Sequence, residues 1–165
     1  MFEYIYNTSF NDHTFETLIS TQVLEHLFQT QDYINECHRI MKNGGYALFT
    51  VPQTYECHSK PYDYYRFTEF SLNKLFEEKF EIVKISPLDN SIETVNQLFI
   101  TSVLFGNFKQ KDELSIIDKV LYKVTMYTLV PFINIFTKAI KMFSTNYDLC
   151  LNYIVIVKKS ESCDS

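Results

Sequence analysis

The sequence predicts an α/β fold in which parallel strands are joined by a helix. The first observation is a short β-rich segment, residues 17–21 (TLIST), which is bounded by polar residues and precedes a helical pattern. The second is a nearly continuous apolar run, residues 46–51 (YALFTV), which has strand length and is stopped by Pro52. Strand, helix, glycine turn and strand make a βαβ unit, so these strands should be parallel with a right-handed crossover.

The helix between these strands carries a start signal, an apolar stripe and a stop signal. We expect Thr30 to be the N-cap, and Asp32 places a negative charge in the first turn, where it suits the helix dipole. Apolar residues recur at spacings of three and four, at Ile34, Cys37 and Met41. Residues 42–44 (KNG) should close the helix with a basic last turn and a glycine that can adopt a left-handed conformation.

The middle of the chain predicts a long loop, a capped helix and another strand. Residues 54–66 (TYECHSKPYDYYR) form a polar and aromatic loop, and loops of this length tend to be functional. Thr68 should cap a helix over residues 69 to about 79. The side chains expected to face inward from it are Phe70, Leu72, Leu75 and Phe76. Residues 80–85 (FEIVKI) alternate and predict a strand.

The last third is helical in pattern before a final strand. Helices are expected over residues 92–108 and 114–143, and Pro131 should break or kink the second. Residues 149–157 (LCLNYIVIV) predict the last strand. The residues from 158 to 165 form a charged tail that we expect to be disordered. The chain therefore reads as one domain over residues 1–159, with a helical insertion at about 90–145 and a tail at 160–165.

One uncharged stretch of the insertion, residues 124–137, lies between Lys123 and Lys138. It is too short and too polar to cross a bilayer, which takes about 20 apolar residues. We expect this helix to cover the sheet. The alternative is a weak peripheral contact with a membrane surface, where the flanking lysines would reach lipid headgroups.

Composition and charge argue against a nucleic-acid partner, a metal site and secretion. The net charge is −5 and Lys and Arg are scattered, so no basic surface for nucleic acid is expected. The four cysteines fall in no Cys/His ligand spacing, which predicts free thiols and no metal site. The first residues, MFEYIYNTSFND, lack the basic and apolar regions of a signal peptide, so we expect a cytoplasmic protein.

Two longer segments resemble class I S-adenosylmethionine-dependent methyltransferases of the type 11 kind: residues 14–27 (TFETLISTQVLEHL) and 32–52 (DYINECHRIMKNGGYALFTVP). In that family, a strand written roughly FDxVxxxxVLEH is strand four, and a helix ending RxLKPGG leads to strand five. Residues 23–26 match the first pattern outright, with Phe15-Glu16 where Phe-Asp is usual. Residues 39–45 match the second, with Asn43 in place of proline.

The resemblance extends to a loop and to the last strand. Residues 58–68 are similar to the H..PYDYYRYT loop of a subgroup often met near polysaccharide or glycan biosynthesis functions. Residues 153–159 (YIVIVKK) resemble the family's antiparallel seventh strand. The resemblance implies a partial Rossmann-like sheet in which strands four, five and six are parallel, strand seven is antiparallel, and a helical insertion precedes strand seven.

The sequence departs from the family where the cofactor is bound. Such folds use a glycine-rich turn after strand one and an acidic residue ending strand two. The chain has three glycines, Gly44, Gly45 and Gly106, and no GxGxxG pattern. The resemblance thus implies that strands one and two are absent, and that S-adenosylmethionine binds only if an N-terminal half is supplied. Three interpretations stay open: a methyltransferase domain, a non-catalytic fragment or pseudoenzyme, and one half of a split enzyme.

On the cofactor side, the resemblance places Thr21 and Gln22 just past strand four, where the family's chain passes the methionine part of the cofactor. The carboxyl ends of the strands are also where open α/β sheets bind ligands. The alternative is a simple strand-to-helix turn. His26 could orient the cofactor or move protons. Its alternative is structural, capping a helix or bonding a backbone carbonyl.

On the acceptor side, the resemblance places the loop after strand five beside the acceptor pocket. The candidate residues there are His58, Tyr62, Asp63, Tyr65 and Arg66. They supply a titratable base, two phenols, a carboxylate and a guanidinium, which suit a small-molecule, sugar or anionic acceptor. The alternative is that Asp63 and Arg66, three residues apart, form an ion pair that only holds the loop.

Overall fold

The computed structural model describes residues 5–106, 115–143 and 145–160, and the chain divides into two compact units. The first unit comprises Met1–Gln53, Cys57–Leu88 and Asn152–Ser165. The second comprises Thr54–Glu56 and Asp89–Leu151. The second unit is therefore an insertion between the last two strands of the first.

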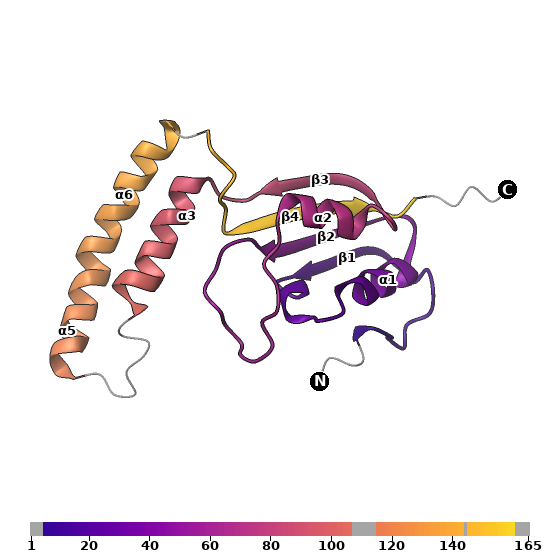
Figure 1. Cartoon of the computed structure of the whole chain (residues 1–165), viewed down its shortest axis with the longest axis horizontal. Coiled ribbons are helices and arrows are strands. Elements are labelled where there is room, and N and C mark those ends of the chain that lie inside the picture. The colour runs from indigo at the N-terminus through magenta and orange to yellow at the C-terminus, as the bar shows by residue number, and fades with distance from the viewer. Residues whose placement is uncertain (1–4, 107–114, 144, 161–165) are drawn as a thin grey trace. The chain divides into compact units, whose positions relative to one another are not determined.

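A four-stranded sheet forms the centre of the first unit (Figure 1). Its strands are β1 (Phe15–Thr21), β2 (Met41–Pro52), β3 (Glu81–Pro87) and β4 (Asn152–Lys158), in the order β1-β2-β4-β3. β1 and β2 are parallel, and β4 is antiparallel to both β2 and β3. β3 therefore runs parallel to β2, which confirms the predicted three parallel strands and one antiparallel strand. Within the described residues, β1 lies at one edge.

The helix between β1 and β2 is confirmed, but its ends differ from the prediction. α1 spans Thr30–Ile40, and its N-cap is Gln29, without a side-chain cap bond, instead of Thr30. β2 begins directly at Met41, so residues 42–44 belong to the strand and not to a helix end. Gly44 does have the expected positive φ, 75°. Gly45 is required for another reason, since a Cβ there would lie 2.8 Å from the carbonyl oxygen of Glu16 on β1.

The second helix, α2 (Glu69–Phe76), begins at the predicted cap. The side chain of Thr68 accepts a bond from the backbone N–H of Ser71, whose own side chain reciprocates in a capping box. Leu72 and Phe76 are fully buried, but Phe70 is 85% exposed, so the prediction that it faces inward is wrong. Two helical positions separate Phe70 from Leu72, about 200° around the axis, so only one of them can face the core.

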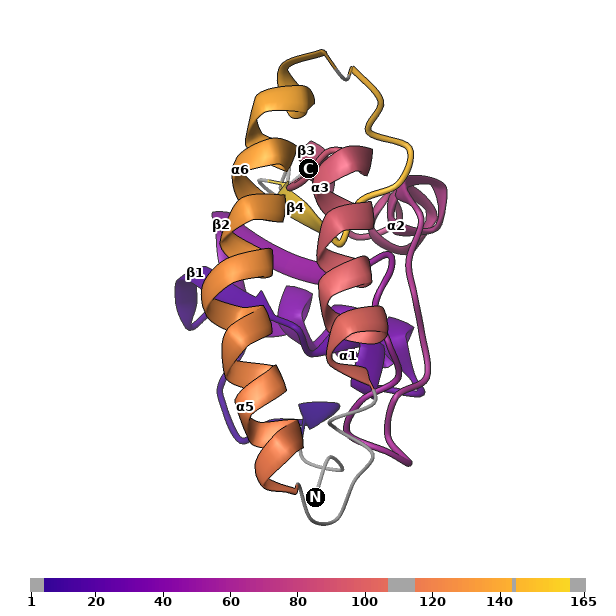
Figure 2. The same cartoon turned by 90° about the vertical axis from the view of Figure 1, so that its left-hand side faces the viewer.

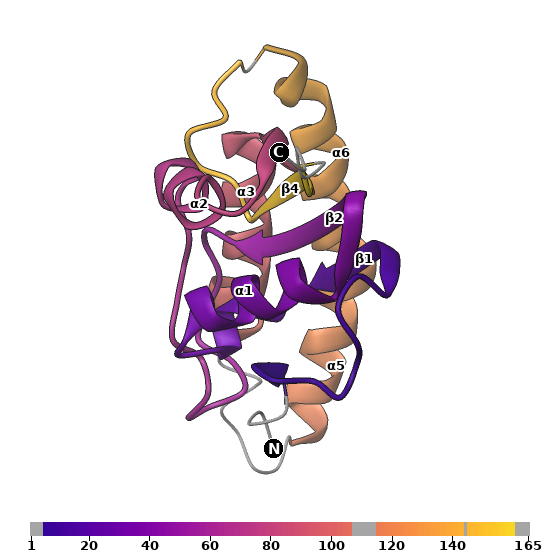
Figure 3. The ribbon, with the colours of Figure 1, turned by 90° about the vertical axis from the view of Figure 1, so that its right-hand side faces the viewer.

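The core of the first unit lies between the sheet and the two helices, which cover the same face (Figures 1 and 3). The rings of Phe49 on β2 and Phe76 on α2 lie 4.8 Å apart between centroids. The Tyr33 hydroxyl on α1 donates to Ser20 Oγ on β1 at 2.9 Å. On the opposite face of the sheet, Ile19 is 70% exposed, and its register continues through Leu48 to Ile156.

The second unit is a helical hairpin, which Figure 2 shows from the side. α3 (Ser91–Leu98) runs into the π-helical η3 (Phe99–Leu104). The return helix, Ile116–Phe143, has 28 residues and consists of the four segments α5 (Ile116–Val124), η4 (Thr125–Leu129), α6 (Val130–Ile140) and η5 (Lys141–Phe143). Pro131 does not break it. The π-helical η4 lies directly before Pro131, where a widened turn accommodates the missing N–H and the ring.

Side-chain contacts hold the hairpin together. Asn96 Nδ2 on α3 donates to Asn134 Oδ1 on α6 at 2.9 Å. Lys141 Nζ pairs with Glu93 Oε1 at 2.6 Å. Glu93 also completes a capping box with Asn90 at the start of α3. These contacts fix the pairing of the two helices through polar groups more than through a core.

The return helix is longer than the uncharged stretch considered from the sequence. By length and composition Ile116–Phe143 could cross a membrane, with a mean hydropathy of 1.3 in its most apolar 18 residues, 6% of which are buried. The expectation that the helix covers the sheet stays a prediction.

The end of the chain also differs in part. β4 extends to Lys158, and Lys159 is buried, with its Nζ donating to the carbonyl oxygens of His38 and Met41 at 2.7 and 2.9 Å. The prediction of a disordered tail from residue 158 is therefore wrong for these two lysines. Residues 107, 108 and 114, and most of the tail, lie outside the described residues.

Candidate functional site

The carboxyl end of β1 is shaped by an unusual backbone at Gln22. Its φ is 53°, a left-handed value that costs a residue with a Cβ on the order of 1 kcal/mol or more. Hydrogen bonds hold it there: the Gln22 backbone N–H donates to the Thr50 carbonyl at 2.9 Å. The side-chain Nε2 reaches Thr50 Oγ1 at 3.3 Å and Asn152 Oδ1 at 3.1 Å. Thr21 and Gln22 are both exposed at this edge, where open α/β sheets bind ligands.

Immediately after Gln22 the chain forms a short 3-10 helix, η2 (Leu24–His26), and the long loop folds back onto it. The backbone N–H groups of Tyr64 and Tyr65 donate to the Glu25 carbonyl at 2.8 and 3.3 Å. The Tyr65 hydroxyl donates to the Phe28 carbonyl at 3.0 Å. Main-chain hydrogen bonds thus bring two segments that are more than 30 residues apart into one site.

The two histidines of the site face each other. The rings of His26 and His58 lie 4.9 Å apart between centroids, edge to face at 85°. His26 Nδ1 lies 2.6 Å from the Tyr62 carbonyl oxygen. Because a carbonyl can only accept, Nδ1 carries a proton in this contact, and Nε2 lies on the other side of the ring, toward Glu25. His26 therefore has the backbone-carbonyl bond that its structural alternative predicted.

Asp63 and Arg66 form a two-pronged ion pair within the loop. Arg66 Nη1 and Nη2 lie 2.7 and 2.9 Å from the two carboxylate oxygens of Asp63. The Asp63 oxygen Oδ2 also accepts from the His58 backbone N–H at 2.8 Å and lies 3.5 Å from His58 Nδ1. The Arg66 guanidinium, more than any other group, holds the pKa of the Asp63 carboxyl far below its ordinary value. Both charges are directed at each other, as the ion-pair alternative predicted.

Glu25 is a buried carboxyl beside the two histidines. It is fully buried, and neither Oε1 nor Oε2 has a hydrogen-bond partner among the described residues. Burial raises its pKa, against smaller opposing effects that include the permanent positive charge of Arg66. Glu25 Oε1 lies 3.8 Å from His26 Nε2. The ligand atoms of Glu25, His26 and His58 all lie within 4.8 Å of one another, a spacing that could hold a metal ion.

Comparison with known proteins places this site in a recognisable fold. Residues 3–49 match the family model of the methyltransferase domain. No curated protein sequence matches the chain. Solved structures match almost its full length. The [4+2]-cyclase SpnF has 15% identity to this chain and a TM-score of 0.55. The match covers 96% of this chain and 55% of the cyclase chain.

Two methyltransferases show the same likeness. A SAM-dependent methyltransferase from Archaeoglobus fulgidus has 17% identity and a TM-score of 0.53, with 95% of this chain and 64% of that chain covered. The 1,6-didemethyltoxoflavin-N1-methyltransferase of Burkholderia thailandensis has 11% identity and a TM-score of 0.52, with 95% and 48% covered. The chain has a class I methyltransferase fold. It spans less than two thirds of the length of the first two structures that it matches.

Within this methyltransferase fold, the predicted site residues fall into two groups. His26, His58, Tyr62, Asp63 and Arg66 meet around η2, and Tyr65 anchors the loop to the segment after it. Thr21 and Gln22 lie at the end of β1, where Gln22 contacts β2 and β4. The roles assigned to both groups, on the acceptor side and the cofactor side, stay predictions.

Sequence reasoning missed Glu25 as a site residue. It was matched as part of the VLEH pattern, but the pattern alone does not show that its carboxyl group points into the protein. The available signal was an acidic residue between the apolar Val23-Leu24 and Leu27, where a solvated charge is unexpected. Thr50 and Asn152, which hold Gln22, could not be found this way, because their pairing depends on the strand register.

Proposed function

We propose that this chain supplies the acceptor side of an S-adenosylmethionine-dependent methyltransferase. The observation that carries the proposal is the carboxyl edge of a class I methyltransferase sheet, with Gln22 held in a strained backbone and a polar loop folded over η2. Strained residues persist only where the surrounding structure over-determines them, and they cluster at functional sites. The structurally similar B. thailandensis enzyme was solved with S-adenosylhomocysteine and 1,6-didemethyltoxoflavin bound, which supports a small-molecule acceptor.

The residues of this chain fit part of a cofactor site. Thr21 and Gln22 are exposed at the end of β1 and would contact the methionine part of the cofactor. A glycine-rich turn, which lets backbone N–H groups approach the cofactor closely, is absent from these 165 residues. The cofactor would supply the reactive methyl sulfonium, and a second polypeptide segment would supply the turn that grips it.

On the acceptor side, methyl transfer requires alignment more than side-chain chemistry, because the sulfonium is already a good electrophile. Asp63 and Arg66 form a rigid support for the loop, and His58 is held against Asp63. In this arrangement Asp63 and Arg66 position His58, which is the candidate base for an acceptor hydroxyl or amine. The acceptor class we propose is a small polar or glycan-related molecule. The non-catalytic alternative is a binding module that keeps the same edge without cofactor.

Calorimetric titration tests the proposal in two arms. We expect the 165-residue chain alone to show no micromolar binding of S-adenosylmethionine. A fusion that places a segment with the family's glycine-rich turn before this chain should bind it. In that fusion His58→Ala should reduce methyl transfer to an acceptor more than cofactor affinity. Micromolar binding by the chain alone, or a folded fusion that binds no cofactor, would contradict the proposal.

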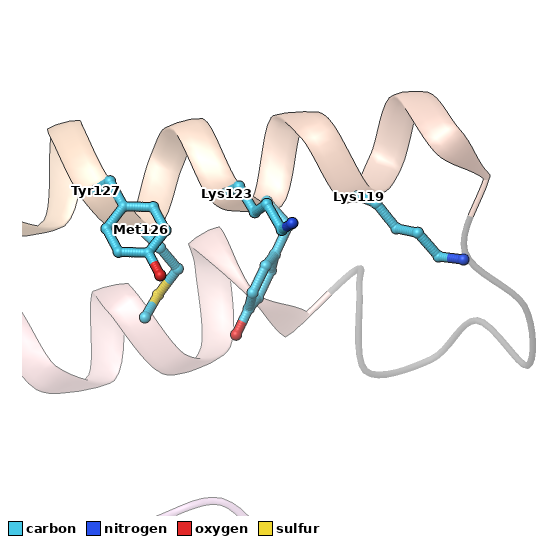
Figure 4. A pocket seen from close by; sticks show the side chains of 5 residues that line it. Lys119, Lys123, Met126 and Tyr127 are labelled. Atoms are coloured by element: carbon cyan, nitrogen blue, oxygen red, sulfur yellow. The ribbon is translucent and has the colours of Figure 1, made fainter.

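We also propose that the return helix contacts an anionic membrane surface. Large apolar side chains along it are exposed, among them Ile117, Tyr127, Phe132, Ile135 and Phe143. Lys119 and Lys123 extend from successive turns beside Met126 and Tyr127 around a hollow of about 380 Å³ (Figure 4). Lysines beside exposed apolar and aromatic groups are typical of a helix that lies in the interface, and Lys123 and Asn134 disfavour a spanning orientation.

Co-sedimentation with vesicles tests the membrane contact. The chain should bind vesicles that contain phosphatidylserine more tightly than vesicles of phosphatidylcholine alone. Phe132→Ser with Ile135→Ser should weaken binding by about tenfold or more, since each side chain contributes roughly 1.5–3 kcal/mol on full burial. Phe70→Ser is the control, because Phe70 is also an exposed apolar residue, 85% exposed, but lies on the first unit. If the chain does not sediment with either kind of vesicle but forms dimers through this helix, the proposal is contradicted.

A further inference from the structure

The strongest unassigned feature of the molecule is the buried carboxylate of Glu25 beside two imidazoles. A buried carboxylate without hydrogen bonds is costly, so such groups are normally paired or bound to a metal. Neither Glu25 oxygen has a hydrogen-bond partner within the described part of the chain, and His26 Nε2 lies 3.8 Å from Oε1, beyond hydrogen-bond distance. We propose that Glu25, His26 and His58 form a binding site for a divalent transition-metal ion, with Zn²⁺ as the best-fitting ion.

Both histidines are oriented as metal ligands usually are. A ligating histidine donates its second ring N–H to a carbonyl or a carboxylate, which fixes the tautomer and aims the other nitrogen at the metal. His26 Nδ1 has the Tyr62 carbonyl at 2.6 Å, which leaves the Nε2 lone pair on the side of Glu25. His58 Nδ1 has Asp63 Oδ2 at 3.5 Å, which favours the same tautomer. The outer partners are thus a carbonyl for one ring and a carboxylate for the other.

The spacing of the three groups is close to that of an occupied site. Bonds of 2.0–2.2 Å in a tetrahedral arrangement put ligand atoms about 3.4 Å apart. Glu25 Oε1 and His26 Nε2 are 3.8 Å apart, and all three ligand atoms lie within 4.8 Å. Small side-chain rotations would close the difference.

The neighbouring charges also permit a cation. The permanent positive charge that acts on Glu25 is Arg66. Its Nη1 and Nη2 atoms lie 2.7 and 2.9 Å from the carboxylate oxygens of Asp63. Its charge is therefore largely compensated inside the loop. Glu25 remains as the carboxylate that would face the metal.

The donor set indicates the kind of metal and its open position. Two imidazoles and one carboxylate suit Zn²⁺ and neighbouring transition ions better than Mg²⁺ or Ca²⁺, which prefer oxygen ligands. A His₂Glu set of three protein ligands leaves a fourth position for water or an oxygen-bearing ligand. This inference rests on the proposed function only where the fourth position would take an acceptor oxygen. With the metal bound, His58 is a ligand in place of the base proposed above. Metal binding itself does not depend on that function.

Titration of the full chain with Zn²⁺ alone tests the site. We expect one site per chain with a micromolar or lower dissociation constant, and with Co²⁺ a visible absorption band of tetrahedral intensity. Glu25→Gln and His58→Asn should each weaken binding by at least about 100-fold, since even outer-shell partners account for 10–100-fold. His13→Asn is the matched control: it removes an exposed histidine of the same unit and should leave the affinity unchanged.

Glu25→Gln keeps the shape of the buried side chain, so it separates loss of metal binding from loss of folding. Circular dichroism should show it folded, with a Tm that Zn²⁺ no longer raises, whereas Zn²⁺ should raise the Tm of the unaltered chain. Two outcomes would overturn the proposal: a folded chain that binds no Zn²⁺ or Co²⁺, and binding that survives both ligand substitutions. Because neither measurement uses S-adenosylmethionine, a negative result here is distinguishable from failure of the proposed methyltransferase function.

Discussion

The two units of the chain use apolar side chains in opposite ways. In the first unit the rings of Phe49, Phe76 and Phe80 are buried between the sheet and α2. In the second unit Phe132, Phe136 and Phe143 are exposed along the return helix. A sheet covered by helices makes two layers that enclose a core, whereas two helices alone leave most of each apolar surface outside. Apolar composition therefore predicts a core only where a second layer is present.

The units also differ in what maintains their structure. The strands of the first unit are paired across long sequence distances, as in the β2–β4 ladder that joins Tyr46 to Lys158. The second unit relies on local helical bonds, the capping boxes at Asn90 and Ser115, and a few polar contacts between its helices. Its stability should therefore depend little on any single apolar side chain.

A pair of phenylalanine substitutions measures this difference. Phe76→Ala removes a fully buried ring that packs on Phe49 and should lower the free energy of unfolding by about 3–5 kcal/mol. Phe132→Ala removes a ring that is 68% exposed and should change it by less than about 0.5 kcal/mol. Urea denaturation of both variants, followed by circular dichroism, provides the comparison.

Phe70→Ala completes the experiment, because Phe70 lies on the same helix as Phe76 but is 85% exposed. It should behave like Phe132→Ala. If Phe132→Ala were instead as costly as Phe76→Ala, the apolar face of the return helix would be covered in solution. The contrast between the two units would then be wrong.

The sequence predicted the first unit well because its signals are local. The apolar run at residues 46–51 and the cap at Thr68 each depend on neighbours in the chain, and both are found where expected. The parallel β1–β2 pair followed from the βαβ rule. The errors arose where tertiary context decides. Lys42 and Asn43 look like a helix end but lie within β2, and Lys159 looks like part of a tail but is buried.

The sequence predicted which segments form the candidate site, but not which of their side chains contact one another. His26 and the loop after β2 were selected from the residue types and the family resemblance. That Asp63 and Arg66 face each other, and that Glu25, His26 and His58 come together, depends on backbone bonds from Tyr64 and Tyr65. Such long-range pairing has no periodic signature. In the second unit, the π-helical turn that absorbs Pro131 likewise has none.

A smaller effect that separates the units is the response of stability to pH. In the first unit, burial lowers the pKa of His38 from an ordinary 6.5 to about 4, and the positive charges of Lys159, Lys79 and His13 add to the effect. Its ring packs edge-on against Phe80 at 5.2 Å between centroids. In the second unit, the hydrogen bond from Lys141 lowers the pKa of Glu93 below its ordinary 4.5. This ion pair therefore affects the stability only below about pH 4.5.

The sign of the His38 effect follows from which state binds the proton. Between pH 6.5 and 4 the unfolded chain protonates this histidine and the folded chain does not, so stability falls as the pH drops through that range and levels off below pH 4. Because the ring is partly solvated, we expect a loss on the order of 1–2 kcal/mol between pH 7.5 and pH 5, less than the full shift would imply. His38→Phe keeps a ring against Phe80 without a titrating group and should remove most of this loss in urea denaturation, whereas His13→Asn should retain it. An equal loss in His38→Phe would show that other groups govern the stability of the first unit in this range, and that its buried histidine is not what distinguishes it from the hairpin.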